Sequence, residues 1–155
     1  MQTQKELIDK FLNCRRIAVV GVSRNPNDFS RKIWEQFRTR GYDAIPVHFE
    51  QTAIDGVRCF SNVHAISPAP ECALILVSKE RTLPVLEDCS AAGVRSVWIY
   101  GIRGEKDVSS DALRWCKENG FEVIAGHCPF MFLPDMALFH RFHGAVWKML
   151  GYYPH

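Results

Sequence analysis

The sequence predicts a three-layer α/β/α domain with a mainly parallel sheet of five to six strands and an added C-terminal helix. Apolar segments rich in β-branched residues alternate with amphipathic helical segments, which is typical of repeated β–α units. The segment 73–77 is apolar throughout, as a parallel strand buried on both faces should be. The 155 residues are enough to bury a core, and we expect one domain spanning residues 1–155.

The expected helices begin near residues that can cap a helix, and several end at a glycine. Thr3 and Glu6 have the spacing of a capping box, and Thr82 is a candidate cap farther along the chain. Segments with a helical apolar period lie at residues 3–12, 30–40, 82–92, 109–119 and 135–150. The first of these helices belongs to an N-terminal helical region, residues 1–13. The expected strands are residues 17–21, 43–47, 57–60, 73–77, 94–101 and 121–125.

Composition narrows the possible partners and the compartment. The net charge is +2, so we expect no broad nucleic-acid surface. No apolar run approaches the roughly 20 residues of a membrane span, and the N-terminus lacks a secretory pattern. Six cysteines occur without a C-x-x-C pair, which favours neither a zinc site nor a disulfide scaffold. We therefore expect a cytoplasmic protein with no membrane contact.

A strand, a polar loop and a helix start follow one another near the N-terminus, as at phosphate-binding sites. The strand ends at Gly21, the loop spans residues 22–26, and the helix is expected from Ser30. Arg24, Arg31 and Lys32 crowd the positive end of the helix dipole. Cations there cost roughly 0.3–1 kcal/mol each unless an anion lies among them. This pattern predicts a ligand that carries phosphate.

The predicted topology brings further cations to the same edge of the sheet. Loops 21–26, 77–81 and 100–104 follow three strands, and ligands of open α/β sheets bind at the carboxyl ends of strands. Lys79, Arg81 and Arg103 would extend the cationic rim of this crevice. Each cation taken singly is equally well explained as a solvated surface charge. Their occurrence after different strands favours a site.

The two common nucleotide-binding fingerprints are missing. Gly21 is followed by Val22, Ser23 and Arg24, so the G-x-G-x-x-G pattern of dinucleotide sites is absent. The second strand leads into residues 48–50 (His-Phe-Glu) and has no acidic residue at its tip. The G-x-x-x-x-G-K-[ST] pattern is also absent. NAD binding and a P-loop nucleotidase are both disfavoured.

Four segments in the same order resemble the small stand-alone coenzyme A-binding proteins and the N-terminal domain of the succinyl-CoA synthetase alpha subunit. They are residues 17–26, 41–47, 97–103 and 120–124, and the likeness covers about residues 10–130. The resemblance implies a Rossmann-like fold that holds coenzyme A at the strand tips, with its phosphates in the loop 22–25. Two departures concern residues 48–50 and the apolar stretch 130–134, which replace the patterns expected of the family.

The loop pattern and the resemblance together assign a set of residues to the cofactor site. They are Gly21, Val22, Ser23, Arg24, Asn25, Arg31, Lys32, Val47, Val77, Ser78, Lys79, Tyr100, Gly101, Ile102 and Cys128.

No residue is assigned a catalytic role. Residues 124–129 resemble the synthetase stretch that ends in Asn-Cys-Pro-Gly, which makes a mixed disulfide between Cys128 and the coenzyme thiol a hypothesis. His127 and Cys128 are a poor catalytic dyad, because neighbours on an extended segment point opposite ways. His140 and His143 have a spacing that can bind a metal, but no third ligand is evident, so no metal is expected.

The resulting prediction is a protein that binds coenzyme A or an acyl-CoA and has no independent catalytic activity. The resemblance stops before the domain that carries the synthetase's phosphorylated histidine, and the chain has no ATP-grasp partner domain. Two alternatives are an NAD(P)-linked oxidoreductase and a protein-interaction module with a cationic rim. A further alternative is a homodimer formed through the aromatic C-terminal segment. The apolar and aromatic residues of this segment are Met131, Phe132, Trp147, Tyr152 and Tyr153.

Overall fold

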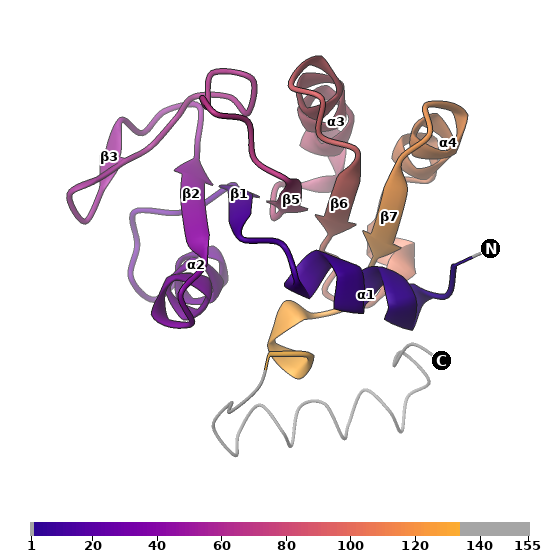
Figure 1. Ribbon diagram of the computed structural model, residues 1–155, viewed down its shortest axis with the longest axis horizontal. Coiled ribbons are helices and arrows are strands. Elements are labelled where there is room, and N and C mark those ends of the chain that lie inside the picture. The colour runs from indigo at the N-terminus through magenta and orange to yellow at the C-terminus, as the bar shows by residue number, and fades with distance from the viewer. Residues whose placement is uncertain (1, 134–155) are drawn as a thin grey trace.

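Five parallel strands form the central sheet in the order β2-β1-β5-β6-β7 (Figure 1). The computed structural model describes residues 2–133, so the expected helix at 135–150 lies outside the described residues. The strands are β1 (Arg16–Val20), β2 (Asp43–Val47), β5 (Cys72–Ile75), β6 (Ser96–Ile99) and β7 (Glu122–Ala125). Val20 lies opposite both Val47 and Ile75, so β1 has a neighbour on each side and the strand order reverses there.

Within residues 2–133, four α-helices cover the two faces of the sheet, which confirms the predicted three-layer arrangement. They are α1 (Gln4–Leu12), α2 (Phe29–Thr39), α3 (Thr82–Ala91) and α4 (Ser110–Glu118). Figure 1 shows α1 and α2 on one side of the strands and α3 and α4 on the other. Phe11 of α1 and Trp34 of α2 pack in one core cluster with Trp98, whereas Leu86 and Cys116 belong to a second cluster on the opposite face.

The strand expected at residues 57–60 is not part of the central sheet. Val57–Arg58 (β4) pairs antiparallel with Ala53–Ile54 (β3), and the two form a separate hairpin. Its turn, Asp55 and Gly56, has positive φ at both positions (49° and 75°), as a tight Asp-Gly hairpin turn requires. The chain therefore folds back on itself here, and the central sheet has five strands in the part of the chain that the structure describes.

The N-terminal ends of two helices, α1 and α4, agree with the helix starts expected from the sequence. Those of α2 and α3 differ from the expectation. Thr3 and Glu6 form the predicted capping box, and Ser109 caps α4. The second helix begins before Ser30, because Asp28 is its cap and accepts the Ser30 N–H at 2.9 Å. The prediction that Thr82 caps α3 is wrong: a short 3-10 turn (Lys79–Arg81) precedes it, and the Thr82 hydroxyl donates to the Ser78 carbonyl at 3.0 Å.

Both edge strands of the sheet have polar partners. The Gln4 side chain donates to the Val123 carbonyl at 3.1 Å and accepts the Ala125 N–H at 3.4 Å, along the edge of β7. On β2, the Phe60 N–H donates to the Pro46 carbonyl at 3.0 Å. Gln4 and the segment at Phe60 thus cover the two edges of the sheet.

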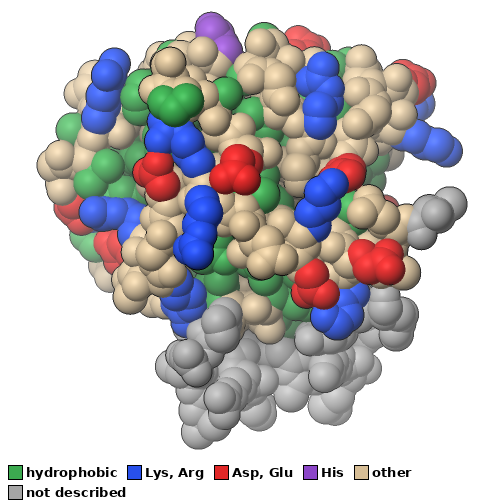
Figure 2. Space-filling model, viewed as in Figure 1, with side chains coloured by type: hydrophobic (Ala, Val, Ile, Leu, Met, Phe, Trp, Pro, Cys, Tyr) green, Lys and Arg blue, Asp and Glu red, His purple; other side chains and the backbone are tan. Residues whose placement is uncertain are grey.

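The surface is mixed in charge. Figure 2 shows Lys and Arg side chains interspersed with Asp and Glu on the displayed face, without a broad area of one sign. Of the helices within residues 2–133, none has both the length and the apolar character needed to span a bilayer.

Candidate ligand-binding site

A cavity of about 710 Å³ opens at the carboxyl ends of β1, β2 and β5, where the strand order reverses. Its floor includes Gly21, Val47 and Val77, which come from the ends of those three strands or just beyond. Phe49 and Arg81 stand on its rim. The volume lies within the range of small-molecule and cofactor sites, and the position is that of ligand sites in open α/β sheets.

Gly21 allows the loop after β1 to lie close to the segment after β5. Its φ is +101°, and a Cβ at this position would lie 3.1 Å from the Leu76 carbonyl carbon and 3.2 Å from a Val77 methyl carbon. Both the backbone angle and the crowding therefore favour glycine. The Gly21 N–H donates to the Val47 carbonyl at 2.8 Å, which joins the ends of β1 and β2 under the cavity.

The loop predicted to hold phosphate is organised by its own side chains. Ser23 N–H donates to the Ser30 hydroxyl, Asn25 N–H to the Ser23 hydroxyl, and Asn27 N–H to the Asn25 side chain, each at 3.0 Å. Asp28 places a carboxylate at the start of α2, which is itself favourable for the helix dipole. The loop is therefore preformed, with Arg24 and Asn25 exposed.

Arg31 has a different environment from the one expected of a ligand-binding cation. Its side chain is only 3% exposed. The guanidinium donates to the Arg24 carbonyl at 2.9 Å, pairs with Glu35 at 3.0 Å and forms an ion pair with Asp55 at the hairpin turn. Arg31 thus ties the loop after β1 to α2 and to the hairpin. Lys32, the next residue, is exposed.

A stacked group of side chains forms the rim of the cavity. Phe49 is 57% exposed, an unusual position for a large apolar side chain. The Arg81 guanidinium carbon lies 4.4 Å from the centre of the Phe49 ring. The His48 ring is nearly parallel to the Phe49 ring, with centroids 5.1 Å apart. Phe49 was not predicted as a site residue, and an aromatic residue two positions beyond a strand end is the signal that could have identified it.

Two acidic residues line the cavity, Glu80 and Asp88, and the Asp88 carboxylate is already paired. The Asp88 carboxylate accepts the backbone N–H of Val63 at 2.5 Å and that of His64 at 3.2 Å, and it also contacts the His64 ring. Asp88 therefore holds the 63–64 segment in place, and its charge is partly offset by these donors. Among the described residues that line the cavity, Arg81 is the cationic one, and Glu80 is its neighbour in the chain.

The cavity unites only part of the predicted site. Among the predicted residues, Gly21, Val47, Val77 and Ser78 line it. The remaining predicted residues are not part of its lining: Val22, Ser23, Arg24, Asn25, Arg31, Lys32, Lys79, Tyr100, Gly101, Ile102 and Cys128.

An aromatic cluster occupies the region between the start of α2 and the loop after β6. The Phe29 ring stacks on Tyr100 at a centroid distance of 4.7 Å and meets the Phe130 ring edge-on at 5.4 Å. Burial raises the pKa of Tyr100 to about 12. In the same loop, Gly101 packs so closely that a Cβ would lie 2.4 Å from the Gly104 carbonyl oxygen. Ile102 is 70% exposed.

Cys128 is a buried thiol. It is 2% exposed, and burial raises its pKa to about 11. Because a thiolate is the reactive form, this cysteine is a weak nucleophile at neutral pH. Within residues 2–133, no three His, Cys, Asp or Glu side chains are grouped as metal ligands; His140 and His143 lie outside that range.

Comparison with known proteins identifies relatives along most of the chain. Residues 15–134 match the family model of the CoA binding domain. The chain is 26% identical over 129 residues to the alpha subunit of the ADP-forming acetate–CoA ligase II of Pyrococcus furiosus. The match covers 79% of this chain and 28% of the relative, so the chain spans less than a third of that protein.

Solved structures support the fold. A hypothetical protein from Pyrococcus horikoshii OT3 aligns with a TM-score of 0.73 at 22% identity, covering 83% of this chain and 87% of its own. The dinucleotide-forming acetyl-coenzyme A synthetase 1 of Ca. Korarchaeum cryptofilum aligns with a TM-score of 0.63 at 23% identity, covering 75% of this chain and 27% of its own.

Proposed function

The chain belongs to the CoA binding domain family, and we propose that it binds coenzyme A or an acyl-CoA at the cavity beyond β1, β2 and β5, without catalysing a reaction by itself. The observation that carries this proposal is the coincidence of the family match over residues 15–134 with a cavity at the strand-order reversal. The relative named as an acetate–CoA ligase alpha subunit supports the same ligand class.

We assign the base of the ligand to the apolar cavity and its phosphates to the loop after β1. Gly21, Val47 and Val77 give the cavity apolar lining, and the exposed Phe49 ring stands at its rim. The exposed cations Arg24 and Lys32 belong to the loop and to the first turn of α2, where phosphate charge would be stabilised. Ser78 and Lys79 follow β5 on the same side of the sheet.

The thiol end of the ligand is assigned to the loop after β6. Tyr100 and Gly101 follow β6 directly, and the exposed Ile102 could contact an apolar pantetheine arm or acyl chain. A mixed disulfide with Cys128 is not part of the proposal, because this thiol is buried and protonated at neutral pH. A cytoplasmic location agrees with such a role.

Calorimetric titration of the full chain with coenzyme A, dephospho-coenzyme A, NADP and NAD tests the proposal. We expect micromolar binding of coenzyme A and much weaker binding of NAD. Dephospho-coenzyme A lacks one phosphate, so weaker binding of this compound would report a contact to that group. Tighter binding of NAD or NADP would instead support the oxidoreductase alternative. Binding of none of the four compounds would contradict the proposal and favour an interaction module.

Self-association through the aromatic C-terminal segment remains a separate proposal. Met131 and Phe132 are partly buried against the core, whereas Trp147, Tyr152 and Tyr153 lie outside the described residues. Sedimentation velocity of the full chain and of a Trp147→Ala variant measures this directly. A dimer that the substitution weakens would support the interface, and a monomeric full chain would exclude it.

A further inference from the structure

A smaller cavity adjoins the one assigned to the ligand. Its volume is about 280 Å³, and its lining includes Arg58 and Phe60. Phe49 and Ser61 line both cavities, so the two hollows are neighbours that share part of their walls. A substituent on a ligand in the larger cavity is therefore within reach of the smaller one.

Backbone hydrogen bonds hold Arg58 beside the tip of β2. Arg58 is the last residue of β4, two positions before Phe60. The Phe60 N–H donates to the Pro46 carbonyl at 3.0 Å, and the Phe60 carbonyl accepts the His48 N–H at 2.9 Å. These bonds join the chain that leaves the hairpin to the end of β2, so the Arg58 side chain starts from a defined place next to the cavities.

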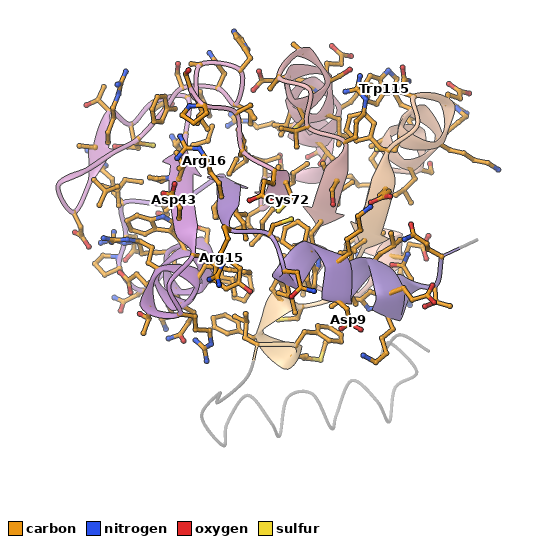
Figure 3. All side chains as sticks on the ribbon, viewed as in Figure 1. Asp9, Arg15, Arg16, Asp43, Cys72 and Trp115 are labelled. Carbon is orange, nitrogen blue, oxygen red and sulfur yellow. The ribbon has the colours of Figure 1, made fainter. Side chains whose placement is uncertain are left out.

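The Arg58 guanidinium lies on the wall of the smaller cavity and has no anionic partner there. Its central carbon lies 4.5 Å from the centre of the Phe60 ring, which lines the same cavity. Within residues 2–133, no carboxylate forms an ion pair with it. By contrast, Arg16 and Asp43, both labelled in Figure 3, pair at 2.5 Å at the amino ends of β1 and β2. Arg58 is consequently available to an anion supplied by a ligand.

The smaller cavity also has an acidic residue, Glu50, in its lining. The Glu50 backbone N–H donates to Nδ1 of His48 at 3.1 Å, and the residue is exposed. A hydrated carboxylate repels a nearby anion only weakly, because water and salt screen the interaction. Glu50 should therefore reduce the affinity for an anion in this cavity without preventing its binding.

We propose that Arg58 binds a phosphate group on the ribose of the ligand, with the base in the larger cavity and this phosphate in the smaller one. The inference rests on the proposed function, because it takes coenzyme A as the ligand. Coenzyme A carries a phosphate on its ribose, close to the base, whereas dephospho-coenzyme A has a hydroxyl there. A guanidinium can donate two parallel N–H groups to phosphate oxygens. Arg58 thus makes the site selective for coenzyme A over its dephospho form.

Calorimetric titration of the wild-type chain and of Arg58→Ala with both compounds tests the inference. The quantity of interest is the ratio of the two dissociation constants. The wild-type chain should bind coenzyme A roughly tenfold more tightly than dephospho-coenzyme A. Arg58→Ala should lose this advantage by binding coenzyme A more weakly, with the affinity for the dephospho form unchanged. Arg58→Lys keeps the charge and should retain part of the selectivity.

Arg95→Ala is the matched control. Arg95 is also an exposed arginine on an aromatic ring, 5.2 Å from the centre of Phe121, but it precedes β6 at the opposite edge of the sheet. This variant should leave the ratio unchanged, and circular dichroism checks that each variant is folded. Glu50→Gln should raise the selectivity for coenzyme A, because it removes a repulsive charge.

The outcomes separate this inference from the proposed function. If Arg58→Ala weakens both compounds equally, or leaves the ratio as it is, the role of Arg58 is overturned and coenzyme A binding stands. A lower selectivity in Glu50→Gln would contradict the placement of the phosphate in the smaller cavity. If the wild-type chain binds neither compound, the proposed function is wrong and this inference with it.

Discussion

Phe49 and Arg81 stack across the mouth of the cavity, with the guanidinium carbon 4.4 Å from the ring centre. Phe49 follows β2 and Arg81 precedes α3, so the contact links two loops that are far apart in the sequence. Both side chains are exposed. The Phe49 ring therefore has a cation–π partner without being buried, and an exposed aromatic ring can stack on a flat ligand.

Replacing Phe49 with alanine should weaken the binding of coenzyme A while leaving the fold intact. Loss of one ring that stacks on a base costs about 1–2 kcal/mol, roughly a fivefold to thirtyfold rise in Kd. Calorimetry provides the measurement. Phe49→Tyr keeps the ring and is the matched control, for which we expect near wild-type affinity. Equal affinity of the Phe49→Ala and wild-type proteins would place the base elsewhere.

The double substitution Arg24→Ala and Lys32→Ala should weaken coenzyme A binding through lost phosphate contacts. We expect a loss of about 1.5–3 kcal/mol, roughly tenfold to a hundredfold in Kd, which becomes smaller at high salt. The unfolding free energy should hardly change, because both side chains are exposed. Lys117→Ala removes an exposed cation at the far end of α4 and should leave binding unchanged. If Lys117→Ala weakened binding equally, the loss of affinity would come from the changed net charge of the protein and not from lost phosphate contacts.

Arg31→Ala should act mainly on stability. The substitution removes the buried guanidinium that joins the Arg24 carbonyl, Glu35 and Asp55. Its carboxylate partners are partly exposed and can be solvated, so we expect a loss of about 1–3 kcal/mol in the unfolding free energy. Urea denaturation measures it. An unchanged unfolding free energy together with weakened ligand binding would restore Arg31 to the role of a ligand-binding cation.

Asp107 should make stability depend on acid pH. Hydrogen bonds from the Arg103 side chain, at 2.8 and 3.0 Å, and from its backbone N–H, at 2.7 Å, hold the pKa of the Asp107 carboxyl below its usual range. The folded state therefore favours the carboxylate. Its stabilising effect is complete above the unfolded pKa of about 4 and is lost as the pH falls through the folded pKa.

Comparison of Asp107→Asn with the wild-type protein isolates this effect. The variant should be less stable at neutral pH, and the difference in unfolding free energy should shrink as the pH is lowered below about 4. Chemical denaturation at a series of pH values provides both curves. A difference that stays constant with pH would show that the carboxylate charge has no part in it.

Local signals in the sequence predicted the layers and most element boundaries. The spacing of Thr3 and Glu6 was sufficient for the first cap, because a capping box involves only neighbouring residues. The run of apolar residues at β5 was equally sufficient to predict a strand, because a strand that is buried on both faces is apolar at every position. The strand expected at residues 57–60 contains β4, but its partner Ala53–Ile54 was not predicted, because two residues are too few to show an alternating apolar pattern.

The candidate site was less predictable because it depends on contacts between distant residues. The role of Arg31 follows from Asp55, which lies in a hairpin 24 residues farther along. The exposure of Phe49 depends on how the loop after β2 meets Arg81. Neither pairing has a sequence period or a fixed spacing. The glycine at position 21 was an exception, because a strand that ends in glycine already indicates a close backbone approach.

The Gln4 amide has a consequence for solubility. An open strand edge exposes peptide groups to which a second chain can add, and this is a common route to aggregation. By accepting from Ala125 and donating to Val123, the Gln4 side chain occupies two of the backbone groups to which an added strand would bond. Gln4 is held in place by a capped helix, α1. Its side chain thus helps to prevent a strand of another molecule from pairing with β7.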